Sequence, residues 1–398
     1  MEPALVTRFM QIGMFYQIQV PKPWTSSSDF DRHWEMLEQV VLAEELGFHS
    51  VWLADHLFRT EWSHSSAPDV TLAAISQRTS RIRLGIAVAV PPVQHPLHIA
   101  ARTATLDIFS KGRVDLGVGR SGYPYQMAAF GVDLEDATGM VDEALEIIPK
   151  AGTEGMFSYK GKYFDIPARE VHPKPVQTPH PPMWLGCSRE ETFRKAGELG
   201  LGCLAMAGGG PDRVTQLVNA YREGIRNAKP VGKVIKDRVS VSTLAICGES
   251  RKKTQERGAE ILDWYRGQQD LRHDRVWQEQ DPSNVPSDYQ WHYQRSAATD
   301  KTKQEDISSL DLIKQGQYCI GDPDDCLRFL DQYVTTGVDE IMPLFQIGPM
   351  ANKEVTETLR LFGKHVIPLL EKTDGAEGQT INPIQPFTIQ SPEITPLG

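Results

Sequence analysis

The sequence lacks the features that mark secreted, membrane-spanning or nucleic-acid-binding proteins. No run of about 18 apolar residues occurs among its 398 residues, so we expect no transmembrane helix. The opening stretch, MEPALVTRFMQIGMFY, has no basic start, apolar core or small-residue cleavage site of a secretory signal. A net charge of −10 argues against nonspecific nucleic-acid binding, which needs a basic surface. We therefore expect a cytoplasmic protein without a membrane or nucleic-acid partner.

Cysteine is also scarce, and its five copies form no CxxC pair. An odd number in apolar contexts such as LAICG and QYCIG favours buried free thiols in a reducing compartment. The sequence contains no HExxH helix, and His95 and His98 in QHPLH have no third ligand nearby. We accordingly expect no metal site.

What the chain does contain is a repeated alternation of short β-branched runs and longer stretches with helical periodicity. Strands are expected over residues 8–16, 51–55, 81–90, 112–119, 181–187, 201–207, 238–248 and 338–346. Helices are expected over residues 30–46, 69–79, 97–109, 134–148, 190–199, 211–227, from about 250, 323–336 and 355–370, and a hairpin over 159–167. Eight such units predict an α/β fold, a (β/α)8 TIM barrel, and the alternative is an open doubly wound sheet.

The domain organisation follows from the segments that fall outside this alternation. Residues 1–370 are expected to form a single barrel domain, and residues 371–398 an extended tail rich in Pro, Gly, Thr and Gln. Residues 266–314 are polar yet rich in Trp and Tyr, which predicts an insertion near the C-terminal face of the barrel. Such aromatic residues suit either a lid over the mouth or a contact with another subunit.

The stretch VWLADHLF raises the first candidate site, because a buried strand delivers Asp55 and His56 to its carboxyl end. A strand emerging into water would give the same pattern. In a barrel, however, the carboxyl ends of the strands form the active face, so this pair is expected at the mouth.

Glycines after the fourth expected strand give a second candidate. The motif GxGxxG at Gly117, Gly119 and Gly122 is typical of dinucleotide sites, but YPYQMAAFG follows with Pro124 and no clear helical start. We expect instead that these glycines let a ligand approach the rim, where Arg120 offers a cation for a phosphate.

A third candidate follows the fifth expected strand, in GCSREETFRKAGELG. A turn at Gly186 and Ser188 leads into a helix whose first N–H groups favour a phosphate, and the hydroxyl groups of Ser188 and Thr192 could add donors. A plain helix cap at Ser188 is the alternative. Together with Arg120, the turn predicts a phosphorylated cofactor across the mouth.

Four stretches, in this order, resemble the bacterial luciferase-like family of flavin-dependent monooxygenases. They are AEELGFHSVWLADH, QHPLHIAARTATLDIFSKGRVDLGVGR, GKYFDIP with HPKPVQTPHPPMWLGCS, and VDEIMPLFQ, within a resemblance that runs from about residue 9 to 370. The resemblance implies a (β/α)8 barrel that binds reduced FMN, usually supplied by a separate flavin reductase. The flavin would react with O2 to give a C4a-(hydro)peroxide that oxygenates a small organic substrate, and a homodimer is expected.

The resemblance also assigns roles to residues. His56 matches the active-site histidine of the family, Arg120 the phosphate-contacting arginine and the Ser188 turn the phosphate loop. A histidine that titrates near neutrality suits an acid/base role, with Asp55 either fixing its tautomer or facing solvent.

The strand GIAVAV would lie against the ring system of the cofactor, with Ala87 and Ala89 small enough to admit it.

Two departures from the pattern of the family leave the identity of the cofactor open. Many relatives have an acidic residue where Gln126 stands, and some a second phosphate arginine at Thr138. The alternatives are an F420-dependent oxidoreductase on the same barrel and a noncatalytic flavin-binding protein.

Overall fold

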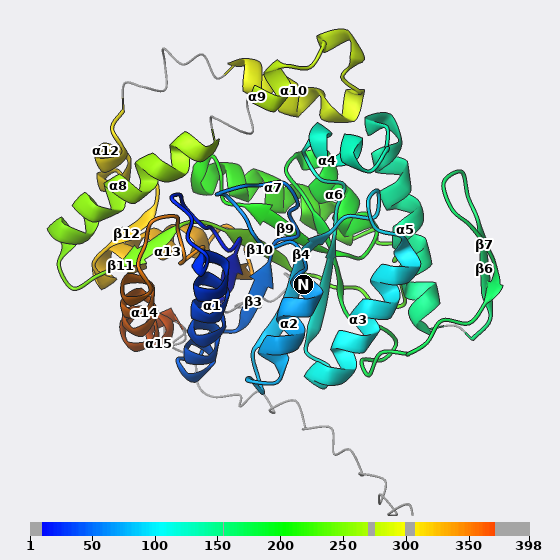
Figure 1. The fold of residues 1–398 in the computed structure, drawn as a ribbon, viewed down its shortest axis with the longest axis horizontal. Helices are drawn as coiled ribbons and strands as arrows, with labels where there is room; N and C mark the ends of the chain where they lie inside the picture. Colours follow the sequence, from blue (N-terminus) through cyan, green and yellow to red (C-terminus); the bar gives the residue numbers. More distant parts are fainter. Residues whose placement is uncertain (1–9, 154, 270–274, 299–306, 371–398) are drawn as a thin grey trace, which may run out of the picture.

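The fold is a closed barrel of parallel strands, seen in a computed structural model that describes residues 10–153, 155–269, 275–298 and 307–370 (Figure 1). One sheet has the strand order β1-β13-β10-β9-β8-β5-β4-β3-β2, and every pair in it is parallel. Because β1 and β2 are the two halves of the first strand, the sheet begins and ends on the same strand. The predicted (β/α)8 barrel is confirmed, and the open sheet is wrong.

The barrel strands follow the expected order along the chain. Their bounds are β1 Gln11–Ile12, β2 Met14–Tyr16, β3 Ser50–Leu53, β4 Arg83–Ala89, β5 Val114–Val118, β8 Met183–Gly186, β9 Gly202–Met206, β10 Val239–Ser242 and β13 Glu340–Ile341. Most of their residues are buried, as expected for parallel strands covered by helices on the outside.

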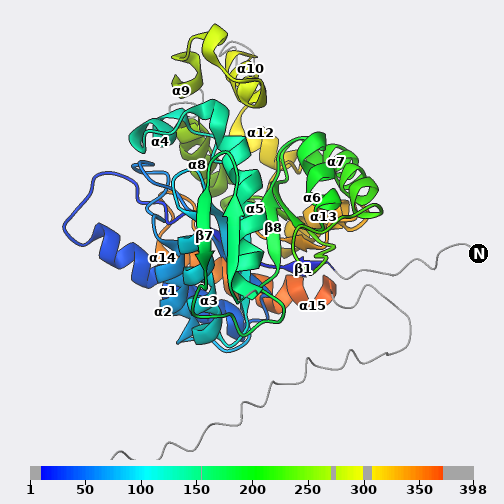
Figure 2. The same ribbon diagram turned by 90° about the vertical axis from the view of Figure 1, so that its right-hand side faces the viewer.

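Helices surround this barrel (Figures 1 and 2). They are α1 Ser28–Glu45, α2 Pro68–Ser76, α3 Pro96–Ser110, α4 Pro124–Ala129, α5 Ala137–Thr153, α6 Glu190–Glu198, α7 Gly210–Ile225, α8 Arg251–Gln269, α13 Pro323–Val334, α14 Asn352–Leu361 and α15 Ile367–Leu370. The helix expected over residues 355–370 corresponds to α14, the π-helical turn η5 Phe362–Val366 and α15, and its apolar residues Val355, Leu359, Phe362, Val366 and Leu370 are buried. Among the described residues, no helix is both long and apolar enough to cross a lipid bilayer.

Two tryptophans fill the middle of the barrel. Trp52 on β3 lies beside Gly85 on β4, and Trp184 on β8 lies beside Gly202 on β9. A Cβ atom on either glycine would overlap the neighbouring indole ring. The two rings meet edge to face with their centroids 5.2 Å apart, and they pack with Leu204 and other interior residues. This layer closes the barrel below the mouth.

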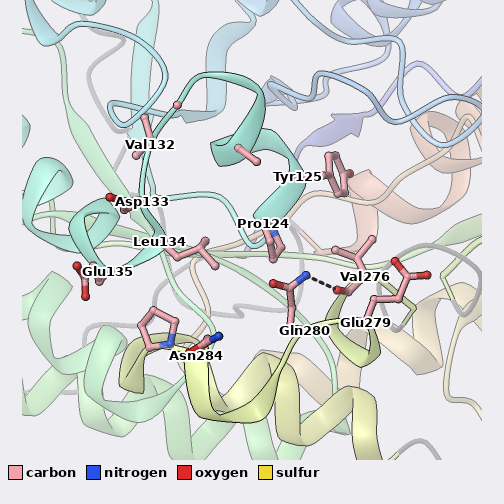
Figure 3. Close-up of a pocket in the computed structure, with 13 residues that line it drawn as sticks. Pro124, Tyr125, Val132, Asp133, Leu134, Glu135, Val276, Glu279, Gln280 and Asn284 are labelled. Atoms are coloured by element: carbon pink, nitrogen blue, oxygen red, sulfur yellow. Dashed lines mark hydrogen bonds between the residues drawn. The ribbon is translucent and has the colours of Figure 1, made fainter.

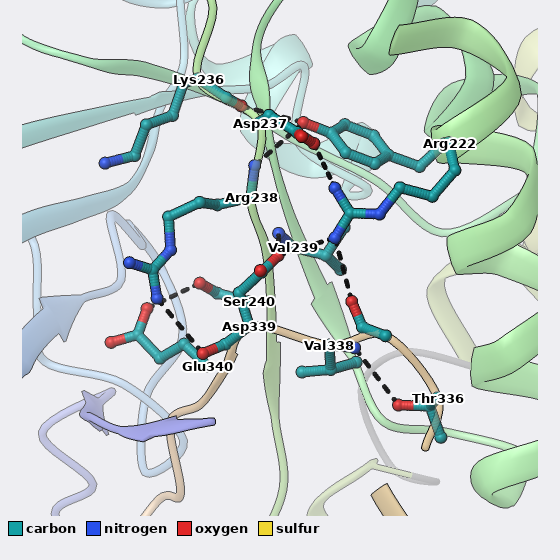
Figure 4. A network of polar contacts seen from close by, with 12 residues as sticks. Arg222, Lys236, Asp237, Arg238, Val239, Ser240, Thr336, Val338, Asp339 and Glu340 are labelled. Carbon is teal, nitrogen blue, oxygen red and sulfur yellow. Dashed lines mark hydrogen bonds and ion pairs between the residues drawn. The ribbon is translucent and has the colours of Figure 1, made fainter. Parts of the chain in front are cut away.

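Charged side chains occupy the amino-terminal end of the barrel (Figure 4). Arg222 on α7 pairs with Asp237 and, at 3.0 Å, with Asp339, whose carboxylate also accepts from the Val239 N–H. Deeper inside, Asp115 pairs with Arg83, and burial of its carboxyl group is outweighed by nearby cations that lower its pKa. Each buried charge thus has a partner, which is typical of a structural network rather than of a ligand site.

Some expectations about elements need correction. The expected strand over 238–248 divides into β10 and β11 Ala245–Cys247, and β11 pairs with a strand that the sequence did not suggest, β12 Cys319–Gly321. The hairpin is confirmed as β6 Phe157–Lys160 and β7 Asp165–Arg169. All five cysteines are buried and free, as expected.

The insertion forms a small helical segment over the carboxyl ends of the strands (Figures 1 and 2). We call residues 275–298 the cover; they comprise α9 Arg275–Gln278, the 3-10 turns η3 Pro282–Asn284 and η4 Ser287–Tyr289, and α10 Gln290–Ala298. The expected start at 266 is too early, because α8 continues to Gln269, and α12 Ser309–Lys314 packs back on α8. The expected tail, 371–398, lies outside the described residues.

Candidate functional site

Asp55 and His56 follow β3 at the mouth, but their side chains are not brought together. Trp52 points into the barrel, so the alternation of a strand directs Asp55 toward the surrounding helices. There Asp55 is buried and accepts a hydrogen bond of 2.6 Å from Gln94 Nε2. It neither fixes the His56 tautomer nor faces solvent, and both expectations for it are wrong.

The burial of Asp55 changes its acid–base behaviour. Desolvation is the largest cause and raises the pKa of Asp55 to about 7, while the Gln94 hydrogen bond acts in the opposite direction. A small cavity of about 20 Å³, bordered by Asp55, Asp69 and Arg102, lies between β3, β4 and helices α2 and α3. Asp55, rather than His56, is therefore the member of the pair that titrates near neutral pH.

His56 is partly buried at the mouth, and its ring lies edge to face with that of Tyr123, with the ring centroids 6.2 Å apart. Burial, with a smaller contribution from the charge of Arg59, lowers the pKa of His56 to about 3. Nδ1 is buried and has no hydrogen-bond partner among the described residues. The expectation that this histidine titrates near neutrality is thus wrong for the protein without ligands, in which His56 is neutral.

Arg59 is a residue of this site that the sequence did not indicate. It lies in the loop after β3 and is only 3% exposed. Its guanidinium carbon lies 4.1 Å from the ring centroid of Tyr123 and 5.5 Å from that of Trp62. The sequence signal was weak, because an arginine six positions after a strand end usually lies in solvent.

Several residues predicted to bind the cofactor do come together in one cavity. Arg120, Gly186 and Thr192 all line a cavity of about 190 Å³ next to the carboxyl ends of β5 and β8. Arg189 and Lys195, which carried no signal in the sequence, add two cations to it. The cavity is several times larger than the roughly 30 Å³ of one water, and its three cations suit a phosphate. We call it the cation pocket.

Carboxylates balance the cations in this pocket. Lys195 Nζ lies 2.6 Å from Asp142 Oδ1, and Arg189 Nε lies 4.0 Å from Glu191 Oε2. Arg120 is covered from above by η4, because its Nη2 donates to the Asp288 carbonyl at 2.6 Å. An incoming phosphate would therefore have to displace some of these partners.

The turn before α6 is arranged differently from the expectation. Ser188 is exposed and does not line the cation pocket, and the N-cap position belongs to Arg189, not Ser188. The Thr192 hydroxyl accepts from the N–H groups of Ser188 and Arg189 at 3.2 and 3.1 Å. This hydroxyl therefore caps the helix, and a phosphate would compete with it.

Glycines near the rim lie close to the side chain of Val88. Cβ atoms on Gly117, Gly119 and Gly186 would all meet Val88, at 3.0, 2.6 and 3.4 Å. Gly119 and Gly186 nevertheless line the cation pocket, so the expectation that a ligand approaches the rim at these glycines stays a prediction. Pro124 in fact begins the short helix α4 at its first turn, but the motif still does not open a helix directly after its strand.

The two alanines of β4 lie on different sides of the strand. Ala87 packs with Val88 against the interior tryptophan cluster, on the side where a ring system was expected. Ala89 is buried beside Asp55 and Gln94 in the small cavity that faces the helices. Of the pair, only Ala87 lies inside the barrel.

A larger, open cavity of about 790 Å³ lies between α4, the following loop and the cover (Figure 3). Tyr125, Leu134 and Val276 give it an apolar side, and three carboxylates belong to its lining: Asp133, Glu135 and Glu279. None of the predicted site residues lines it, so we interpret it as the gap under the cover rather than as the reaction site.

Comparison with known proteins agrees with the barrel fold. A profile of the luciferase-like monooxygenase family matches residues 10–340. The chain belongs to the luciferase-like monooxygenase family. Members of the family differ in the cofactor named for them, as individual relatives show.

Two relatives illustrate the range of this luciferase-like family. The oxygenase component of a flavin-dependent trigonelline monooxygenase of Acinetobacter baylyi is 30% identical over 38% of this chain and 42% of its own length. An F420-dependent glucose-6-phosphate dehydrogenase of Amycolatopsis mediterranei is 24% identical over 84% of this chain and 94% of its own. The chain spans only about half the length of two further curated relatives that it matches, 45% and 54%.

A solved structure shows the same fold. The FMN complex of the oxygenating constituent of 3,6-diketocamphane monooxygenase, from Pseudomonas putida, superposes with a TM-score of 0.71. The two sequences are 20% identical, and the match covers 90% of this chain and 98% of the Pseudomonas chain. At this identity the likeness shows the luciferase-like barrel and nothing finer.

Proposed function

We propose that the protein is a flavin-dependent monooxygenase that uses reduced FMN and O2 to oxygenate a small organic substrate. The observation that carries this proposal is the cation pocket, where Arg120, Gly186 and Thr192 meet at the rim of a luciferase-like barrel. Bound reduced flavin would supply the two electrons that activate O2. Because the Acinetobacter relative is named as an oxygenase component, we propose a separate flavin reductase as the partner.

The residues present fit the phosphate of such a cofactor. Arg120, Arg189 and Lys195 would hold it, with the first turn of α6 alongside. Val88 and Ala87 would lie against the ring system, since both pack on the inner side of β4. Above them, the cover would keep water out of the mouth.

In this proposal His56 is neutral and acts first through hydrogen bonding. Its Nδ1 has no partner among the described residues, so that atom can donate to, or accept from, a reacting group. A proton reaches His56 only when a nearby negative charge raises its pKa from about 3. We therefore propose that acid/base catalysis by His56 depends on the bound ligands.

Hydride transfer with F420 is the second candidate. The match to the Amycolatopsis F420-dependent dehydrogenase extends over 84% of this chain and favours it specifically. Anaerobic titration of the protein with reduced FMN, and separately with F420, distinguishes the two. Binding of reduced FMN without F420 supports the oxygenase; the reverse favours the dehydrogenase; no binding of either refutes both.

Substitution of Arg120 tests the pocket. Arg120→Gln should weaken the binding of reduced FMN by about 1–3 kcal/mol, because a charge-assisted contact with the phosphate is lost. The matched control is Arg78→Gln, whose exposed guanidinium pairs with Glu38 outside the pocket. Unchanged affinity in Arg120→Gln would remove this residue from the phosphate site.

A further inference from the structure

Arg59 is a buried cation that makes little use of its hydrogen-bonding capacity within the part of the chain that the structure describes. A guanidinium has five N–H donors and stays charged in proteins. Among the described residues, Arg59 Nη1 makes one long hydrogen bond of 3.4 Å to the Tyr125 hydroxyl, and Nε has no partner. No carboxylate in the described part of the chain forms an ion pair with Arg59. Burial of a charge in this state is costly unless a ligand completes it.

Another arginine of the same chain shows how a structural guanidinium is arranged. Arg113 is 9% exposed, and its N–H groups make five hydrogen bonds of 2.8–3.0 Å. Four go to backbone carbonyls and one to the Thr79 hydroxyl. Arg59 is more deeply buried than Arg113, but its one hydrogen bond, at 3.4 Å, is longer than any of these five, so the described residues around Arg59 do not satisfy its guanidinium.

Aromatic rings surround Arg59 on several sides. Tyr123 lies against its guanidinium, and Trp62 packs on Tyr265 of α8 with the two rings tilted and their centroids 4.4 Å apart. Ring faces partly compensate a buried cation, but they accept few hydrogen bonds from the edge of the guanidinium. They also leave the planar fork of donors available for a planar, bidentate acceptor such as a carboxylate.

The location of Arg59 connects it to the reaction site. It follows His56 by three residues in the loop after β3, and its charge is felt by the His56 ring. We propose that Arg59 binds a carboxylate group of the organic substrate and thereby holds the substrate beside His56. This inference rests on the proposed function, because it assigns a substrate class to the same site.

The inference has a consequence for His56. A carboxylate bound to Arg59 would neutralise the positive charge that disfavours the imidazolium, so the pKa of His56 would rise when substrate binds. The substrate would then bring His56 closer to an acid/base role.

Paired probes that differ in charge but hardly in shape test the proposal. Benzoate and benzamide, phenylacetate and its amide, and octanoate and its amide are titrated into the full chain by calorimetry, without flavin. At least one carboxylate should bind more tightly than its amide, and Arg59→Gln should lower the affinity for that carboxylate by about ten-fold to a hundred-fold. Arg78→Gln serves as the control and should bind like the wild type.

Three results would overturn the proposal. The first is that no acid binds more tightly than its amide, which includes the case in which no acid binds at all. The second is unchanged carboxylate binding in Arg59→Gln. The third is loss of carboxylate binding in Arg120→Gln together with displacement of the carboxylate by inorganic phosphate, which would place the anion in the cation pocket. Titration of each variant with reduced FMN is run in parallel. Retained FMN binding with a failed carboxylate test refutes the role of Arg59 and leaves the proposed function intact.

A stability measurement keeps the test decisive if Arg59→Gln folds poorly. Arg59→Met should have a melting temperature equal to or above that of the wild type, because it removes a buried charge that forms no ion pair and only one long hydrogen bond with the described residues. Arg113→Met should melt at a lower temperature, because four carbonyls and a hydroxyl lose their donor. A large loss of stability in Arg59→Met would show that Arg59 is structural and would overturn the proposal.

Discussion

At the scale of single residues, the neighbours Asp55 and His56 respond to burial in opposite directions. Desolvation disfavours the charged form of each, which raises the pKa of the carboxyl group to about 7 and lowers that of the imidazole to about 3. The sequence places both at the end of β3 but cannot tell which side of the strand each one takes. That depends on Trp52 pointing inward, which fixes the alternation.

The two groups should give opposite contributions to the pH dependence of stability. His56 binds fewer protons folded than unfolded between about pH 3 and 6.5, so its contribution to the free energy of unfolding falls as pH decreases. Asp55 binds more protons when folded between about pH 4 and 7, so its contribution falls as pH increases.

Urea unfolding of His56→Gln, Asp55→Asn and wild type between pH 5 and 7 separates these contributions. As the pH rises from 5 to 7, the free energy of unfolding of Asp55→Asn should increase relative to that of the wild type by up to about 3 kcal/mol. As the pH falls from 6.5 to 5, that of His56→Gln should increase relative to the wild type by up to about 2 kcal/mol. Parallel curves for all three proteins would contradict the burial of both groups.

At the scale of elements, the order of strands and helices could be predicted because each barrel unit repeats the same hydrophobic alternation. The exceptions have identifiable causes. Helix α4 begins with Pro124, which is well suited to the first helical turn but was interpreted as a break. Strand β12 has three residues and pairs with β11 outside the barrel, so it leaves no periodic signal.

Strand β9 offers a test of how tightly neighbouring elements pack. Gly202→Ala would drive its methyl group into the Trp184 indole, so we expect a loss of about 1–3 kcal/mol in the free energy of unfolding. Gly208→Ala is the control, since no atom lies within 4 Å of its added Cβ, and it should be nearly neutral. In a Trp184→Leu background the cost of Gly202→Ala should become smaller. Equal effects of Gly202→Ala and Gly208→Ala would contradict this packing.

At the scale of the whole molecule, the cover has its own hydrophobic cluster that joins it to the barrel rim. Trp277 and Tyr289 pack there with Val90, Met127 and Ala137 from the rim. The Trp277 indole donates to the Gly122 carbonyl at 3.1 Å, and Arg120 lies 4.0 Å from the Tyr289 ring. An insertion was predictable from its composition, whereas its docking on the loop that carries Arg120 was not, because that contact joins residues about 170 positions apart.

Removal of Trp277 should release the cover without unfolding the barrel. Trp277 is fully buried, so Trp277→Ala should lower the free energy of local opening by about 3 kcal/mol. Hydrogen exchange followed by mass spectrometry should show faster exchange in residues 275–298 and unchanged exchange in the barrel strands. Trp34→Ala, which removes a half-exposed tryptophan from α1, should leave the cover unchanged. Unchanged exchange in Trp277→Ala would mean that the cover is held elsewhere.

The tryptophan layer of the barrel determines the route by which ligands can enter and leave. Because Trp52 and Trp184 close the interior and paired charges fill its amino-terminal end, the barrel is accessible only from the carboxyl ends of its strands. Every ligand therefore enters and leaves by the same opening beneath the cover, and the ligand that binds last must dissociate first.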